Sequence, residues 1–146
     1  MTRILTRRRG ERGAALLEAA ITVPMILLIS VGIFEFGRAY QTWQVLTNAA
    51  REGARVAVIS GTTDDAVKAR VVAYMQNGAL NDGAATMVTV TRGVTLTGTT
   101  DTGTQITINY PFQFMVLNPV VRLIAPTSTT GAPITMQSNA LMRNEM

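Results

Sequence analysis

The sequence predicts an α+β protein: one long N-terminal helix, a short second helix and a small antiparallel sheet of three or four strands. Three observations predict this fold class. Residues 14–34 form an apolar run whose only charged residue is Glu18. Residues 44–59 carry small and apolar side chains at helical spacing, with charged residues mainly on the other side. Beyond Gly83 apolar and polar residues alternate, which is the period-two pattern of half-buried strands.

Residues 1–13 are predicted to be a basic leader that is disordered or removed by cleavage. The leader holds five arginines and one acid, Glu11, whereas the rest of the chain holds eight Lys/Arg and eight Asp/Glu. The formal net charge of +4 therefore comes from the leader and does not indicate nucleic-acid binding. The chain has no cysteine and no histidine, which excludes disulfides, Ser-His-Asp and Cys-His catalysis and the usual zinc sites. We expect no enzymatic activity, no cofactor and no metal.

Residues 14–36 are predicted to be a transmembrane helix. The 21 residues from Ala14 to Phe34 would span about 31 Å as a helix, close to the thickness of the hydrocarbon core of a bilayer. The arginines ahead of this segment predict a cytoplasmic N-terminus and a C-terminal domain across the membrane. Pro24 is expected to kink or loosen the helix. A carboxylate at Glu18 is costly in such a segment, which predicts a partner and a role for it.

Residues 37–60 are predicted to continue the helix outside the membrane, ending near Ile59. The small residues on one side of residues 44–59 should allow another element to pack closely against this helix. We expect that element to be the protein's own sheet, with another subunit as the alternative. Glu35 and Arg38 are expected to form an interfacial pair of little energetic value. Tyr40 and Trp43 are either interfacial anchors or packing residues.

Residues 61–146 are predicted to form the small α+β domain. A helix over residues 64–77 should be capped by Thr63 or Asp64, stop at Gly78 and bury Val67, Val71, Tyr74 and Met75. Strands are expected over residues 87–91, with 94–96 continuing or pairing, and over 105–110 and 134–142. Pro111 should end its strand or confine it to an edge. Residues 112–125 are expected to form a short helix or a covering loop, followed by a loop over 126–133.

Two groups of residues resemble a known family. Residues 13–18, GAALLE, resemble the processing site of type IV pilin-like precursors, which a prepilin peptidase cuts after a glycine, with a glutamate fifth in the mature chain. Glu18 is fifth counted from Ala14. Residues 32–37 and 48–55 resemble the TadE-like family, the minor pilins or pseudopilins of tight-adherence (Flp) pilus systems, as does the end, residues 141–145. The matching positions are Phe34, Glu35, Phe36, Gly37, Asn48, Ala49, Ala50, Arg51, Glu52, Gly53, Ala54 and Arg55.

This resemblance implies a type IV pilin-like fold and a minor pilin or pseudopilin role in assembling a tight-adherence pilus. It implies cleavage between Gly13 and Ala14, and a new ammonium on Ala14 that pairs with Glu18 and sets the register between subunits; the i,i+4 spacing permits this pair. The implied partners are the lipid bilayer, a prepilin peptidase, other pilins or pseudopilins and the inner-membrane assembly platform. The implied location is the bacterial inner membrane, with a periplasmic domain and incorporation into an extracellular pilus as a further step. Ala19 stands where major Flp pilins usually carry an aromatic residue, which favours a minor component.

Two other readings remain open from the residues. In the first, Glu18 snorkels at the cytoplasmic interface of an uncleaved signal anchor, and the protein is a single-pass periplasmic binding module. In the second, an ordinary signal peptide is cut after Gly32, where Ser30 and Gly32 meet the small-residue requirement, and a soluble domain is released. The apolar run continues past Gly32 without a helix break, which argues against the second reading.

Overall fold

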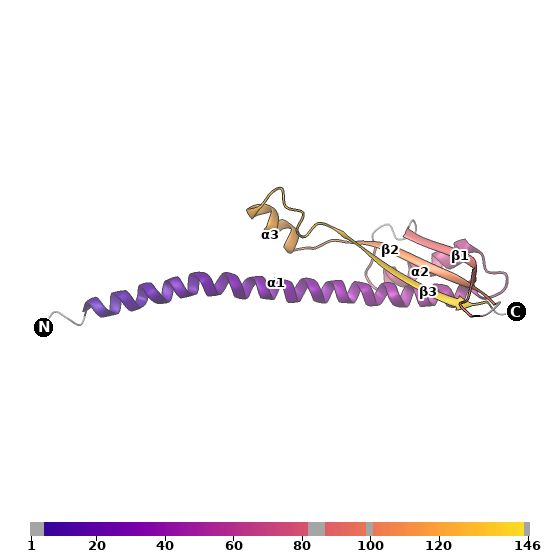
Figure 1. Ribbon diagram of the computed structural model, residues 1–146, viewed down its shortest axis with the longest axis horizontal. Helices are drawn as coiled ribbons and strands as arrows, with labels where there is room; N and C mark the ends of the chain where they lie inside the picture. The colour runs from indigo at the N-terminus through magenta and orange to yellow at the C-terminus, as the bar shows by residue number, and fades with distance from the viewer. Residues whose placement is uncertain (1–4, 82–86, 99–100, 145–146) are drawn as a thin grey trace.

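One long helix runs the length of the molecule, and the other elements lie along its C-terminal half (Figure 1). The computed structural model describes residues 5–81, 87–98 and 101–144. The element order is α1 (Leu5–Ala57), α2 (Asp64–Asn77), β1 (Val88–Thr95), β2 (Thr102–Phe112), α3 (Leu117–Ile124) and β3 (Ile134–Arg143). The sheet and α2 pack on the C-terminal part of α1, while its N-terminal part extends alone. The predicted α+β, pilin-like fold is confirmed: a long apolar helix, short helices and an antiparallel sheet.

Helix α1 is longer at its N-terminus than predicted. It begins at Leu5, so residues 5–13 of the uncleaved chain are helical where the leader was expected to be disordered or removed; its removal stays a prediction, and residues 1–4 lie outside the described part of the chain. The physical reason is that leucine, arginine and glutamate are good helix formers and the leader contains no proline, so the turns of α1 propagate backwards through it. Pro24 lies inside the helix without interrupting it, and Figure 1 shows a gentle curve rather than a sharp bend.

Helix α1 ends at Ala57, two residues before the predicted end. Gly61 follows with φ of 84°, the left-handed conformation expected of it. Helix α2 has the predicted bounds, and the Thr63 hydroxyl accepts a hydrogen bond from the Ala66 N–H at 3.3 Å. At its other end Ala79, not Gly78, takes the left-handed conformation, with φ of 63°. The expected burial of Tyr74 is wrong, because the residue is 37% exposed.

The three strands form one antiparallel sheet in the order β1-β2-β3. Residues 87–91 and 94–96 contribute to one strand rather than two, since β1 runs through a register shift between Thr91 and Val94, where Gly93 has φ of 73°. Strand β2 ends at Phe112, one residue after the predicted end at Pro111, and it is the central strand of the sheet rather than an edge strand. The proline is tolerated because β1 pairs with β2 only up to Ile108 within the described residues, which leaves β3 as the one neighbour at Pro111.

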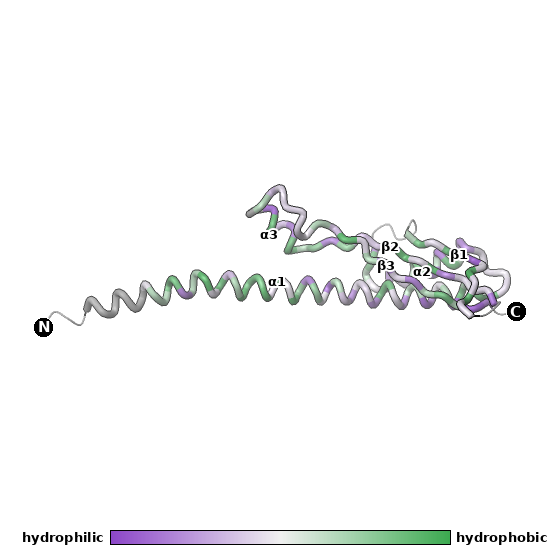
Figure 2. The backbone as a smooth tube through the Cα atoms, viewed as in Figure 1, coloured by the Kyte–Doolittle hydropathy of each residue, from purple (hydrophilic) through white to green (hydrophobic). Residues whose placement is uncertain are grey.

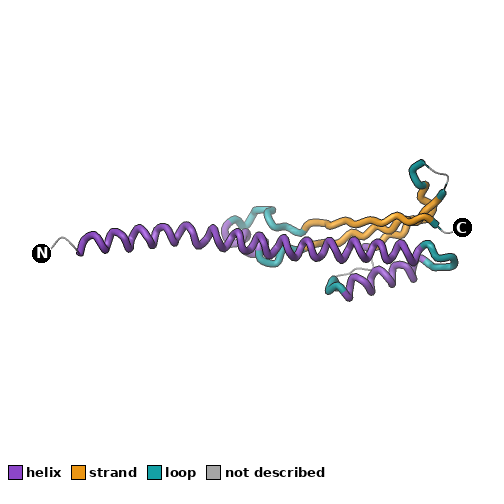
Figure 3. The backbone as a smooth tube through the Cα atoms, turned by 90° about the horizontal axis from the view of Figure 1, so that it is seen from below, coloured by secondary structure: helices purple, strands orange, loops and turns teal. Residues whose placement is uncertain are grey.

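The core lies where the C-terminal part of α1 meets α2 and one face of the sheet (Figure 3). Ala49, Ala50 and Ala54 of α1 are fully buried there, against side chains of α2 and β2 such as Val71 and Ile106. The stripe of small residues therefore packs on the protein's own domain, as expected, and lets the helices and sheet approach closely. Residues 82–86, which include the predicted turn at Asp82 and Gly83, and residues 99–100 of the β1–β2 turn lie outside the described residues.

Residues 112–125 contain the short helix that was one of the two predictions for them. Helix α3 and the loop after it interrupt the path from β2 to β3 and stand apart from the sheet, alongside the middle of α1 (Figure 1). The loop over residues 126–133 and strand β3 lie where expected.

Candidate membrane and assembly interface

The N-terminal part of α1 is an uncovered apolar surface. Within the described residues, one helix is long and apolar enough to cross a membrane, and none of its apolar window is buried inside the molecule. This part of α1 is therefore not buried in the core of the chain's own domain, and its position near the N-terminus is one that signal sequences share. Figure 2 shows the hydrophobic colour running along α1 ahead of the sheet. The exposed large apolar residues of this surface are Leu16, Leu17, Ile21, Val23, Met25, Ile26, Leu27, Leu28, Ile29, Ile33, Phe34 and Phe36.

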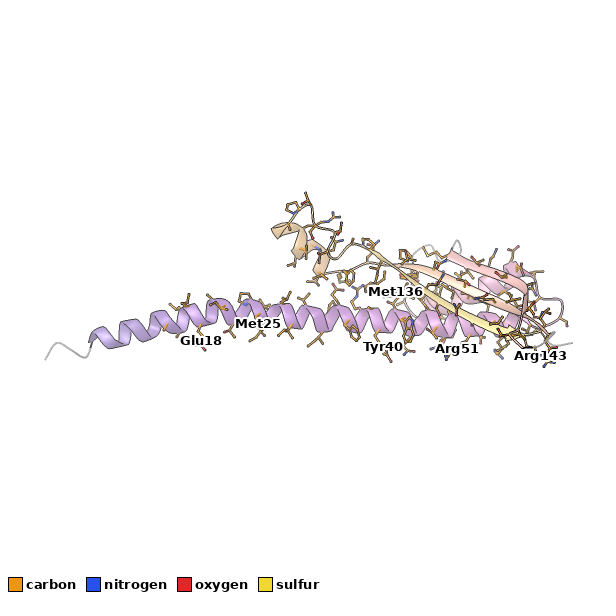
Figure 4. The ribbon with its side chains drawn as sticks, in the orientation of Figure 1. Glu18, Met25, Tyr40, Arg51, Met136 and Arg143 are labelled. Atoms are coloured by element: carbon orange, nitrogen blue, oxygen red, sulfur yellow. The ribbon has the colours of Figure 1, made fainter. Side chains whose placement is uncertain are left out.

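Glu18 projects from this apolar surface. Its side chain is exposed, and among the described residues it has no hydrogen-bonding or ion-pair partner. Figure 4 shows Glu18 and Met25 on a part of α1 that no other element covers. Gly13 and Ala14 are exposed one turn ahead, inside the helix, so the predicted scissile bond is helical in this structure. A protease that cleaves an extended chain must therefore unwind this turn first.

Glu35 is more buried and has more partners than its predicted pair with Arg38 implies. Its side chain is buried, with 3% of the residue exposed, and its carboxylate bridges α1 to α3. One carboxylate oxygen accepts hydrogen bonds from the N–H groups of Val116, at 2.5 Å, and Leu117, at 3.2 Å, and the other accepts one from Arg38 at 3.0 Å. The predicted i,i+3 pair of Glu35 with Arg38 is present, but the carboxylate is buried and has further partners at Val116 and Leu117, so the pair is not the isolated contact of little energetic value that was expected. The i,i+3 spacing predicts the contact with Arg38, but nothing local in the sequence predicts the contact with Val116, which lies 81 residues further along the chain.

The carboxylate of Glu35 acts as a cap supplied from another element. Helix α3 has no side-chain cap of its own at Val116, and the first N–H groups of any helix lack partners within that helix. Two of them point to Glu35 instead, and the negative charge sits at the positive end of the helix dipole. Arg38 completes the connection: its guanidinium lies 5.4 Å from the Phe112 ring centroid and 3.4 Å from the Gln113 carbonyl oxygen.

Residues 48–55 divide into two faces. Ala49, Ala50, Gly53 and Ala54 form the buried one, while Asn48, Arg51 and Arg55 are exposed. Figure 4 shows Arg51 on the outer side of α1. Glu52 pairs with Arg55, three residues further along α1, at 3.1 Å, and with Arg70 of α2 at 2.8 Å, a contact that the sequence does not predict. Hydrogen bonds from Arg55 and then Arg70 lower the pKa of Glu52 from 4.5 to about 2.

Tyr40 and Trp43 lie between the apolar surface and the packed domain. Both side chains are about half exposed and neither belongs to the core; their ring centroids are 6.3 Å apart. The Tyr40 hydroxyl accepts a hydrogen bond from Gln44 at 2.8 Å. Of the two readings open from the sequence, an exposed position beyond the apolar run agrees with interfacial anchoring rather than burial in the domain.

The geometry thus combines an uncovered apolar helix, a lone exposed carboxylate and a domain packed on the other end of the same helix. Comparison with protein-family models matches residues 13–55 to the model described as TadE-like protein. Residues 13–55 are TadE-like. The predicted resemblance is confirmed over the segment that runs from Gly13 through Glu18 and Glu35 to Arg55. The comparisons with curated proteins and with solved structures gave no match.

The TadE-like segment contains nearly all of the candidate interface. It begins at the predicted scissile glycine, includes the uncovered apolar surface and ends with the two-faced run that holds the domain. Within this segment, α1 is long and apolar enough to cross a membrane. The similar run at residues 141–145 lies outside the matched segment, and Glu145 lies outside the described residues.

Proposed function

We propose that the protein is a minor pilin or pseudopilin that takes part in assembling a tight-adherence, Flp-type pilus, after a prepilin peptidase cuts between Gly13 and Ala14. One observation carries the proposal: the TadE-like helix presents an uncovered apolar surface bearing Glu18 and then continues, without a break, into a packed domain. The proposed location is the inner membrane, with the N-terminus cytoplasmic and residues 61–146 as the periplasmic domain. Partners are the peptidase, other pilins and the assembly platform; we propose no enzymatic activity.

The proposed chemistry centres on two charges that lie one helical turn apart. Cleavage leaves an ammonium on Ala14, and the i,i+4 spacing places it on the same face as Glu18. In lipid an unpaired carboxylate is costly, so Glu18 gains most from an ammonium, either its own or that of a neighbouring subunit. The exposure of Glu18, and the absence of a partner for it among the side chains that the structure describes, support this role.

The alternative is an uncleaved, single-pass binding module. It is favoured by two observations: the bond between Gly13 and Ala14 is helical, and an open cleft of about 440 Å³ lies beside Arg38, lined in part by Tyr110, Phe112 and Phe114. Under this reading Glu18 is an interfacial residue and cleavage never occurs. The two functions therefore differ in the covalent state of the mature protein.

Intact mass spectrometry of the protein from membranes with and without the peptidase distinguishes them. The proposal expects loss of residues 1–13 only when the peptidase is present, and no loss in Gly13→Leu, which fills the small site. Glu18→Ala should still insert in membranes but abolish pilus assembly in complementation, whereas Thr22→Ala, an exposed neighbour on the same surface, should assemble normally. An uncut chain in both membranes supports the anchored module, and a cut after Gly32 contradicts both functions.

A further inference from the structure

Helix α3 is held beside the membrane-spanning part of α1. Its first N–H groups bind Glu35, which lies 21 residues after Ala14. At about 1.5 Å per residue this distance is about 32 Å, so Glu35 sits where the hydrocarbon core of a bilayer ends. In Figure 1, α3 lies on the N-terminal side of the sheet, over the middle of α1. With α1 inserted as the proposed function requires, α3 would fall at the level of the leaflet through which α1 leaves the bilayer.

The segment that contains α3 has the composition of a membrane surface element. Residues 115–125, MVLNPVVRLIA, contain eight apolar side chains, one charge, Arg122, and no acid. Met115 is 61% exposed and Val120 is 43% exposed, and the described part of the chain leaves them uncovered. Arg122 is also exposed, and an arginine on such a helix can reach lipid phosphates while its stem stays in apolar surroundings.

We propose that α3 is a second membrane contact, which lies in the headgroup and upper acyl region of the leaflet through which α1 leaves the bilayer. The occupant of its uncovered surface is the lipid of that same membrane, because the start of α3 is held by Glu35, which lies between the exposed Phe34 and Phe36 of the apolar surface of α1. The contacts of Glu35 lower the free-energy cost of this placement. Its carboxylate is neutralised by Arg38 at 3.0 Å and accepts hydrogen bonds from two N–H groups at the start of α3, for which lipid offers no acceptor.

A two-point contact changes how the domain sits on the membrane. With α1 alone, the domain would swing and rotate freely about the exit point of the helix. With α3 seated in the leaflet, one side of the domain is tied to the surface and the rotation of α1 about its own axis is restricted. This inference rests on the membrane insertion of α1 that the proposed function requires, but not on cleavage or pilus assembly.

The test uses single-cysteine variants, which the cysteine-free chain makes simple. Val120→Cys reports α3, Leu28→Cys reports the apolar surface of α1, and Gln76→Cys, at an exposed position on α2, is the control in water. The full-length protein carries a nitrobenzoxadiazole label and is reconstituted in phosphatidylethanolamine–phosphatidylglycerol vesicles. Quenching is measured with nitroxide lipids labelled near the headgroup or deep in the acyl chain, and with aqueous iodide.

The expected result is quenching of the Val120 label by the shallow nitroxide about threefold or more above that of the Gln76 label, and quenching of the Leu28 label by the deep nitroxide. Quenching of Leu28 with a Val120 label that responds like Gln76 would overturn this inference and leave the proposed function standing. A Val120 label shielded from both nitroxide and iodide would point to a protein neighbour and overturn it too. No quenching of Leu28 would overturn both proposals, because α1 would not be inserted.

Discussion

Glu18 and Glu35, the two glutamates of the apolar half of α1, lie in opposite environments. Glu18 is exposed without a partner among the described residues, whereas Glu35 is buried with three donors. The sequence alone predicts the first, since a lone acid in an apolar run draws attention at once. It does not predict the second, because Arg38 at i,i+3 accounts for Glu35 locally and hides its long-range partners.

Removal of the Glu35 carboxylate should release α3 without unfolding the domain. In Glu35→Ala the N–H groups of Val116 and Leu117 lose their acceptor, at a local cost of about 1–3 kcal/mol. Hydrogen exchange of peptides covering residues 115–125, followed by mass spectrometry, should accelerate about tenfold or more. Gln41→Ala, at an exposed position on α1, is the matched control and should leave exchange unchanged. Equal exchange in Glu35→Ala and wild type would mean that Glu35 does not hold α3.

Gly53 lies where α1 packs tightly against Val71 of α2. A Cβ added there would overlap Cγ2 of Val71 and lie 3.5 Å from Cγ2 of Ile106. Gly53→Ala gains about 1 kcal/mol of helix propensity, but overpacking costs about 1–3 kcal/mol, so net destabilisation is expected. Gly37→Ala gains the same propensity in open space and should be neutral or stabilising. Denaturation in detergent checks both; a Gly53→Ala variant as stable as Gly37→Ala would contradict the packing.

At the level of elements, charged side chains join the helices at points that periodicity does not show. Glu52 of α1 binds Arg70 of α2, and Arg92 of β1 reaches Asp64 at 2.6 Å and the Thr62 carbonyl oxygen at 2.8 Å. The helix and strand ranges were largely predictable, because apolar spacing and capping residues act locally. These connections were not, since they join residues 18 to 30 positions apart.

The pair between α1 and α2 should make stability depend on pH in acid. Because Arg55 and Arg70 lower the pKa of Glu52 to about 2 in the folded protein, the carboxylate stabilises the fold above its ordinary pKa of 4.5 and loses this effect as pH falls from 4.5 towards 2. Glu52→Gln should therefore be less stable than wild type at pH 7, by about 1 kcal/mol because the arginines are exposed, and the difference should shrink below pH 4.5.

Urea denaturation in detergent at pH 7, 4.5 and 3 checks this dependence. Asp65→Asn is the control, since the Asp65 side chain is 97% exposed and its nearest ion-pair contact, with Lys68, is long at 4.0 Å. Its stability should follow that of wild type at every pH. A gap between Glu52→Gln and wild type that stays constant from pH 7 to pH 3 would contradict the role assigned to the ion pair.

Across the whole molecule, the sequence predicted the division into an uncovered apolar half and a packed half, because lipid-facing and core-facing helices differ in composition along their length. It could not predict that the leader joins α1 or that α3 stands away from the sheet. Both depend on tertiary context: the leader on the helix that follows it, and α3 on the carboxylate of Glu35. Pro111 shows the same limit. A proline lacks the N–H group that a central strand needs, and the sequence does not show that β1 is too short to pair with β2 at this residue.

Because α1 is continuous, it fixes the direction in which each of its membrane-end side chains points relative to the domain. A rod without a hinge relates every side chain at its membrane end to the domain by a constant turn of about 100° per residue. Over the 17 residues between Glu18 and Glu35, the two carboxylates therefore point about a quarter turn apart around the axis. A neighbouring subunit that contacts Glu18 would therefore approach about a quarter turn around the axis of α1 from the side that carries α3. The helical repeat of α1 thus determines which side of the domain the neighbour leaves free.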